Sequence, residues 1–341
     1  YGITLDGAWI PVVDYSDPKT REHIKAMTLA SVERYKDTPG VLFWLLGNEN
    51  NYGLHWSSFE IEALPEEQQY DARAKYLYSL YGEVIDAIHA MDDKHPVSIA
   101  NGDLQYIDLI VEHAGNVDIL GSNVYRGISA RDLFDEVEEK LQVPFVYTEF
   151  GADAYNARTA SEDHLTQARY VVGQWQEIYE QSYGHGRVGN AIGGYTFQWS
   201  DGWWKYLQES ELDVHNTNAS WPNGGYAEDY VEGRNNMNEE WFGICAKGPT
   251  QPGGLYEVYP RAAYYALQEA YTLDVYDEST TLEGIREHFG AIQPVRWDST
   301  YQSHAAVGET KRLQRARVSN VRLDMWTCLL YTSPSPRDNR V

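Results

Sequence analysis

The sequence Val41-Leu42-Phe43-Trp44-Leu45-Leu46-Gly47-Asn48-Glu49 carries the strongest structural signal in this chain. Six large apolar residues follow one another without alternation, and a polar Asn-Glu pair comes after the glycine that ends the run. An unbroken apolar run of this length is typical of a strand buried on both faces, as in a parallel sheet covered by helices. We therefore expect a parallel strand with a carboxylate just beyond its carboxyl end.

A second segment repeats this pattern about 100 residues later: Pro144-Phe145-Val146-Tyr147-Thr148-Glu149. Carboxylates at the carboxyl ends of strands lie where α/β barrels keep their chemistry. Two carboxylates that face one sugar are the minimum equipment for breaking a glycosidic bond. Glu49, framed by apolar residues, suits the acid, whose pKa must be raised, and Glu149 suits an ionised nucleophile that accepts hydrogen bonds.

Strand-like runs alternate with helix-like stretches along the chain, and this alternation predicts an α/β fold with a parallel sheet. The segment from Leu77 to Ile88 keeps helical spacing of its apolar residues, and helices are expected to start near Ser129, Ser161 and Pro260. The predicted strands are Gly2–Leu5, Val41–Leu46, Pro96–Ala100, Val117–Ser122, Pro144–Thr148 and Ala191–Gln198.

These six strands favour a (β/α)8 barrel, which has eight, and we expect the chain to enter an amino-terminally truncated barrel near its strand 3. Glu49 and Glu149 would then follow strands 4 and 7 and face each other across the barrel mouth. A doubly wound open sheet is the alternative, and it is disfavoured because no Gly-rich phosphate loop follows any strand.

The predicted domain organisation has three parts. Residues 1–274 form the partial barrel, and the long segment 201–254, rich in Gly, Asn and Trp, would frame its site. Residues 275–326 are predicted to be a linker into a further module. Residues 327–341 resemble the translation of a sequencing adapter and are interpreted as a non-native tail, with a natural Ser/Pro-rich linker as the alternative.

Composition disfavours two classes of partner, nucleic acids and membranes. The net charge of −24 disfavours nucleic acid and anionic membrane surfaces, and no run reaches the roughly 18 apolar residues of a membrane span. The two cysteines show no metal spacing, and we expect neither a metal nor another cofactor. The chain starts at Tyr1, so any signal segment would lie upstream, and a periplasmic or secreted location is favoured; the oligomeric state stays open.

Several segments together resemble glycoside hydrolase family 2, and more broadly the clan of retaining (β/α)8 glycosidases that contains it. Residues 38–49 resemble the acid/base strand of that family, and residues 144–155 resemble its nucleophile strand. Residues 117–127 and 195–204 resemble its sixth and eighth strands, and residues 241–243 and 260–267 its closing helix. The similarity extends over roughly residues 1–272. The strand-2 arginine of the clan and the amino-terminal sandwich domains of the family are missing.

The resemblance implies a role for each matching residue. Glu49 matches the acid/base, Glu149 the nucleophile, and Asn48 the residue that holds the sugar 2-hydroxyl. Further matches concern substrate binding: Tyr125 donates to the nucleophile, Trp199 forms the aromatic floor and Asn123 lines the pocket, while Asp201, Trp203 and Trp204 are candidates for further subsites.

These residues imply a retaining glycoside hydrolase that cleaves β-linked sugars by double displacement, through a glycosyl-enzyme intermediate on Glu149. A transglycosylase would use the same residues and differ only in the acceptor that attacks. A carbohydrate-binding relative that has lost catalysis is the alternative from another class, and the presence of both glutamates, Asn48 and Tyr125 argues against it.

Overall fold

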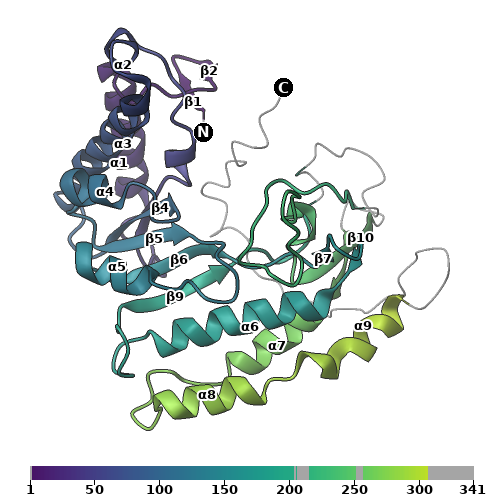
Figure 1. The fold of residues 1–341 in the computed structure, drawn as a ribbon. Helices are drawn as coiled ribbons and strands as arrows, with labels where there is room; N and C mark the ends of the chain where they lie inside the picture. The colour runs from purple at the N-terminus through teal and green to yellow at the C-terminus, as the bar shows by residue number, and fades with distance from the viewer. Residues whose placement is uncertain (1, 203–204, 206–214, 251–255, 306–341) are drawn as a thin grey trace. The chain divides into compact units, whose positions relative to one another are not determined.

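The computed structural model describes residues 2–202, 205, 215–250 and 256–305, which form two compact units (Figure 1). The first unit contains residues 2–124 and 132–148. The second contains residues 125–131 and those that follow 148. The predicted tail at 327–341 lies outside the described residues, as do Trp203 and Trp204.

Parallel strands form the centre of the first unit: β3 (Trp44–Leu46), β4 (Val97–Gly102), β5 (Ile119–Asn123) and β6 (Phe145–Phe150), the last of which crosses into the second unit. β3 pairs with β4 and β4 with β5 in parallel. Every residue of β4 and β5 is buried, which is typical of strands covered on both faces. The predicted α/β class with a parallel sheet is therefore confirmed.

The parallel sheet formed by the described residues is open, with the strand order β3-β4-β5-β6-β9, where β9 is Ala191–Thr196. Strands β3 and β9 therefore lie at its edges. The run Val41–Leu46 forms a shorter strand than predicted, and Leu42 and Leu45 are 72% and 43% exposed. The expectation of burial on both faces is wrong here, because an edge strand is covered by fewer neighbours than a central one.

One helix of the first unit clearly follows the apolar spacing predicted from the sequence. The apolar positions from Leu77 to Ile88 lie in α3 (Glu66–His89) and are mostly buried. Helix α5 (Leu133–Lys140) begins four residues after the predicted start at Ser129. The other helices of this unit are α1 (Pro18–Tyr35), α2 (Phe59–Glu62), α4 (Ile107–Ala114) and the 3-10 helix η1 (Asn50–Tyr52).

The segment Gly2–Leu5 differs from the prediction. It forms β1 (Ile3–Leu5), which pairs antiparallel with β2 (Ala8–Ile10) in a separate hairpin. The connecting Asp6 and Gly7 both have positive φ, 51° and 80°, as a tight two-residue hairpin turn requires. The expectation that this segment is a strand of the parallel sheet is therefore wrong, and the Asp-Gly pair is the signal that indicates the hairpin.

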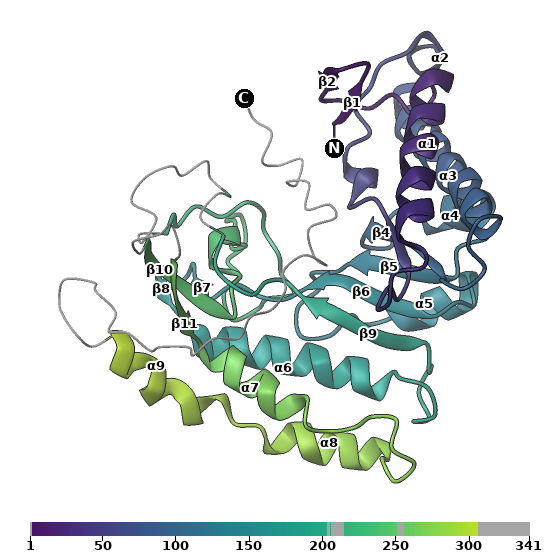
Figure 2. The same cartoon turned by 180° about the vertical axis from the view of Figure 1, so that it is seen from behind.

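The described part of the second unit contains the helices α6 (His164–Glu180), α7 (Ala262–Ala270), α8 (Leu282–Ala291) and α9 (Asp298–Ala305). Helices α6 and α7 lie side by side, and α8 contacts α6 (Figures 1 and 2). Helices α6 and α7 begin close to the predicted starts at Ser161 and Pro260. The remaining elements are β7 (Tyr155–Asn156), β8 (Ser161–Glu162), η3 (Glu239–Trp241), β10 (Cys245–Thr250), β11 (Tyr256–Pro260) and η4 (Pro294–Trp297).

The segment 275–326, predicted to be a linker into a further module, contains helices where the structure describes it. Residues 282–291 form α8 and residues 298–305 form α9. Arg286 of α8 donates to the Glu180 carboxylate of α6, and the hydroxyl of Tyr301 in α9 donates to Glu162. These tertiary contacts stabilise short helices whose sequence periodicity is weak, and such contacts commonly override local propensity.

A buried ion pair joins the loop after β9 to the start of α7. The Arg261 guanidinium donates to both carboxylate oxygens of Asp201, at 2.6 and 2.8 Å, and its Nε donates to Glu162 at 2.7 Å. Although burial disfavours the charged carboxylate, the positive charge of Arg261 and the hydrogen bond with His215 lower the pKa of Asp201 below its usual value. Asp201 and Arg261 therefore stabilise each other as ions inside the second unit.

We predict that Arg261→Met destabilises the second unit by about 3–5 kcal/mol, because the substitution leaves the Asp201 carboxylate buried without its cation. Urea unfolding followed by circular dichroism measures the loss. The double variant with Asp201→Leu should recover part of it, since replacing both partners removes the unpaired charge. Lys19→Met, which breaks an exposed ion pair with Asp6, should leave the unfolding midpoint nearly unchanged. An Arg261→Met midpoint equal to that of Lys19→Met would contradict this role.

Candidate active site

Glu49 lies in a tight loop directly after β3. Gly47 has a φ of +70° and Glu49 itself a φ of 49°, so the backbone passes twice through the left-handed region. A Cβ at Gly47 would collide with the Tyr81 hydroxyl and the Asn50 side chain, which makes glycine necessary here. The backbone N–H of Glu49 donates to the Ala100 carbonyl of β4 at 2.8 Å, and this bond anchors the loop to the sheet.

The Asn50 side chain fixes the same loop from the other side. Its Oδ1 accepts hydrogen bonds from the backbone N–H of Asn48 at 2.8 Å and from the Tyr81 hydroxyl at 3.1 Å. Its Nδ2 donates to the Tyr15 hydroxyl at 2.8 Å. Tyr15 is buried and Tyr81 is half-buried in the first unit, so the backbone at Asn48 and Glu49 is held by packed groups. Sequence reasoning did not assign this role to Asn50.

Asn48 and Asn123, two of the predicted substrate-binding residues, are in direct contact. Asn123 Nδ2 donates to Asn48 Oδ1 at 3.0 Å, and Asn123 Oδ1 accepts from the Thr148 hydroxyl at 2.6 Å. Asn123 is only 2% exposed at the end of β5, whereas Asn48 is partly exposed. The structure thus adds Thr148, which precedes Glu149 on β6, to the residues found from the sequence.

Glu149 lies near the end of β6 and is partly exposed. The Tyr125 hydroxyl donates to Glu149 Oε2 at 3.1 Å. Three contacts hold Tyr125: its carbonyl accepts from Asn223 Nδ2 at 2.6 Å, and its ring meets Phe242 and Trp221 edge-on at centroid distances of 5.5 and 6.1 Å. A hydroxyl donor held in this way is a suitable partner for an ionised carboxylate.

The remaining predicted binding residues differ in accessibility. Trp199 follows β9, is 51% exposed and meets Tyr264 edge-on at 5.7 Å, so about half of its surface remains accessible. Asp201 has no exposed surface, and its oxygens are occupied by Arg261 and His215. The Asp201 carboxylate is therefore not accessible to a sugar, and Asp201 is not a proposed substrate-binding residue.

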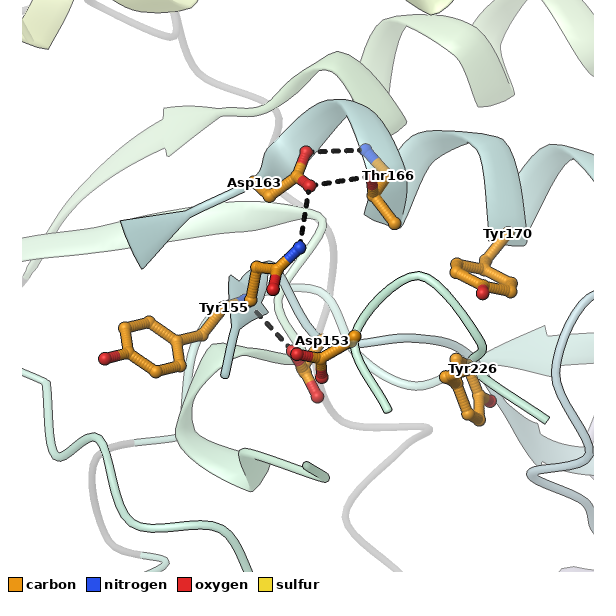
Figure 3. Close-up of a pocket in the computed structure, with 8 residues that line it drawn as sticks. Asp153, Tyr155, Asp163, Thr166, Tyr170 and Tyr226 are labelled. Carbon is orange, nitrogen blue, oxygen red and sulfur yellow. Dashed lines mark hydrogen bonds between the residues drawn. The ribbon is translucent and has the colours of Figure 1, made fainter. Parts of the chain in front are cut away.

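An acidic pocket opens within the second unit, and none of its lining residues is among the site residues predicted from the sequence (Figure 3). Asp163 caps α6 by accepting hydrogen bonds from the backbone N–H and hydroxyl of Thr166, and it also accepts from Asn156. Burial raises the pKa of Asp229 to about 6. Burial and the neighbouring Asp229 raise the pKa of Asp153 well above its usual value. The remaining lining residues are Tyr155, Tyr170 and Tyr226.

The carboxyl groups of this pocket accept hydrogen bonds from the backbone of the protein. Asp153 accepts from the backbone N–H groups of Tyr155 and Asn238, and Asp229 accepts from that of Ala157. Among the residues that the structure describes, no three His, Cys, Asp or Glu side chains are arranged to hold a metal ion. Within the same residues, every helix is too short or too polar to cross a membrane.

Comparison with solved structures finds β-glycosidases. The chain is similar to a GH2 β-galacturonidase from Eisenbergiella tayi bound to glycerol, with 17% identity and a TM-score of 0.46, over 77% of this chain and 38% of that one. It is also similar to β-glucuronidase 2 of Bacteroides uniformis, with 12% identity and a TM-score of 0.49, over 77% of this chain and 27% of that one.

A third similar structure is the β-glucuronidase of Parabacteroides merdae with glycerol in its active site. The identity is 18% and the TM-score 0.42, over 76% of this chain and 27% of that one. The chain thus spans less than two fifths of the length of these three structures. At such identities and TM-scores their activities are not transferred to this chain. No family model and no curated protein matches the sequence.

The pair of raised carboxyl pKa values predicts a fall in stability with pH. Because the pKa of Asp229 rises from 3.8 to about 6 on folding, the folded state binds more protons between these values. Stability should therefore decrease as the pH rises through this window. Asp229→Asn keeps an acceptor for the N–H of Ala157 but cannot ionise. The melting temperature of this variant minus that of wild type should therefore increase from pH 4 to pH 6 and stay constant above pH 6.

Differential scanning calorimetry at several pH values measures this difference. Asp71→Asn, at an exposed position of α3, is the matched control and should show a constant offset from wild type. An Asp229→Asn variant whose offset is equally constant would show that Asp229 does not titrate in this window.

Proposed function

We propose that the protein is a retaining glycoside hydrolase acting on β-linked sugars, with Glu149 as nucleophile and Glu49 as acid/base. The observation on which this proposal rests is the hydrogen bond from the Tyr125 hydroxyl, whose ring is packed against aromatic neighbours, to the Glu149 carboxylate. A donor in this position favours the ionised form that a nucleophile needs. The rigid loop around Glu49 supports the second role, because a general acid must be held at a fixed place.

The proposed reaction has two steps. In the first, the Glu149 carboxylate attacks the anomeric carbon and forms a glycosyl ester, while Glu49 donates its proton to the departing glycosidic oxygen. In the second, Glu49 takes a proton from water, the water oxygen attacks the anomeric carbon, and the ester bond to Glu149 breaks. Each carboxyl group returns to its starting state, and the anomeric configuration is retained. The proton transfers require no metal or other cofactor.

Substrate binding is proposed to involve Asn48 and the exposed ring of Trp199. Asn48 would hold the 2-hydroxyl of the sugar, and the indole of Trp199 would stack against the apolar face of a sugar ring. Trp203 and Trp204 remain proposed further subsites from the sequence alone. We also propose that the open parallel sheet is part of a (β/α)8 barrel, because in such barrels the loops after the strands carry the catalytic residues.

We predict that the two glutamates respond differently to amide substitution in the full-length protein. Glu149→Gln should abolish turnover of all aryl β-glycosides, neutral or uronic, because no glycosyl ester can form. Glu49→Gln should retain the first step with activated aryl glycosides, whose leaving groups need no proton, and lose about 10²–10⁴-fold with unactivated ones. Stopped-flow release of the aryl group measures the first step separately from the second.

Glu112→Gln, at an exposed position, is the matched control and should hydrolyse all substrates at the wild-type rate. Equal losses for Glu49→Gln and Glu149→Gln on every substrate would refute the assigned roles. A wild-type protein that binds oligosaccharides without cleaving any glycoside would instead favour a binding protein. Efficient transfer to an added sugar acceptor would identify a transglycosylase that uses the same residues.

A further inference from the structure

We propose that Asn123 is a positioning residue that sets the orientation of the Asn48 amide, so that Asn48 presents its NH2 group to the substrate. This inference rests on the proposed function, because it concerns the residue that would hold the sugar 2-hydroxyl. It changes the role predicted for Asn123 from the sequence, which was a direct contact in the pocket.

Burial excludes a direct contact between Asn123 and a substrate. The residue is 2% exposed, and both polar ends of its side chain have protein partners. It lies at the last position of β5, between Asn48 after β3 and Thr148 on β6. A buried amide with both ends occupied influences a ligand only through its neighbours.

The structure gives each hydrogen bond around Asn123 a direction. The Thr148 hydroxyl donates to Asn123 Oδ1, which leaves Asn123 Nδ2 facing Asn48. An amide nitrogen only donates, so Asn48 must turn its Oδ1 toward Asn123. The backbone of Asn48 is fixed separately by the bond from its N–H to Asn50. With backbone and carbonyl both held, Asn48 keeps its Nδ2 for an outside partner.

This orientation restricts the group that Asn48 recognises. Its outside partner must accept a hydrogen bond, as the oxygen of a sugar hydroxyl does. A protonated 2-amino group has no lone pair to accept, and the Asn48 NH2 group would meet another donor. We therefore infer that the substrates are β-glycosides with a free 2-hydroxyl and that 2-ammonium sugars are rejected.

Asn123→Asp tests the orientation, because a carboxylate of the same shape accepts hydrogen bonds and cannot donate. In this variant Asn48 should rotate its NH2 group inward and present its carbonyl outward. Solvent-exchange NMR of the side-chain amides reads the orientation directly, with the Asn48 signals assigned by their loss in Asn48→Asp. In wild type, the Asn123 NH2 protons should exchange about tenfold more slowly than those of Asn48. In Asn123→Asp, the Asn48 protons should become the slowly exchanging ones.

Kinetics provide the second readout. With a free 2-hydroxyl on the substrate, Asn123→Asp should lower kcat/KM by about 10–100-fold, as expected for one lost hydrogen bond in a buried site. With the matching 2-deoxy substrate, Asn123→Asp should leave kcat/KM nearly unchanged, because the affected contact is absent. Thr148→Val should show the same substrate-dependent loss, and Thr148→Ser, which keeps the donor, should restore the wild-type value.

Two results would overturn the proposal. One is slow exchange of the Asn48 NH2 protons in wild type, which would mean that the amide points the other way. The other is an equal kinetic loss on both substrates, which would make Asn123 a purely structural residue. If the wild-type protein hydrolyses no glycoside, the proposed function fails, whereas the exchange measurement still decides the orientation of Asn48.

Discussion

Parallel pairing of β3, β4 and β5 is the constraint from which the geometry of the first unit follows. Parallel strands end at the same edge of a sheet, so residues far apart in sequence meet there. Asn48 and Asn123, which follow different strands, are brought within 3.0 Å of each other in this way. Buried apolar side chains of β4 and β5 stabilise the sheet, and the polar groups at its edge satisfy one another.

The predicted site residues of each unit are held in place by different contacts within that unit. In the first unit, Gly47 permits a left-handed turn and the Asn50 side chain holds the loop that carries Glu49. In the second unit, Phe242 and Trp221 hold the Tyr125 ring, and Tyr125 holds Glu149. The buried pair of Arg261 and Asp201 fixes the chain after β9. Rigid support of this kind is what a catalytic or binding residue requires.

Local patterns in the sequence predicted the α/β class, the central parallel strands and the helix that contains Leu77–Ile88, because these depend on hydrophobic periodicity. The hairpin at Asp6-Gly7 was missed although its turn signal is present. Asp201 was predicted to be a subsite residue, because its partner Arg261 is 60 positions away and leaves no local signal. The amide network was also invisible, since Asn48 and Asn123 are 75 positions apart and their orientation depends on Thr148. Contacts across such separations carry no local signature.

The central claim is that Glu149 forms a covalent bond to the sugar. The most direct measurement is mass spectrometry of the full-length protein after reaction with an activated 2-deoxy-2-fluoro β-glycoside, which slows release of a glycosyl ester. The account predicts that the mass increases by one sugar and that peptide mapping places the sugar on Glu149. Three results would contradict the account. The first is hydrolysis of the parent glycoside with inversion of configuration. The others are hydrolysis without any adduct from the fluoro sugar, or an adduct on another carboxylate.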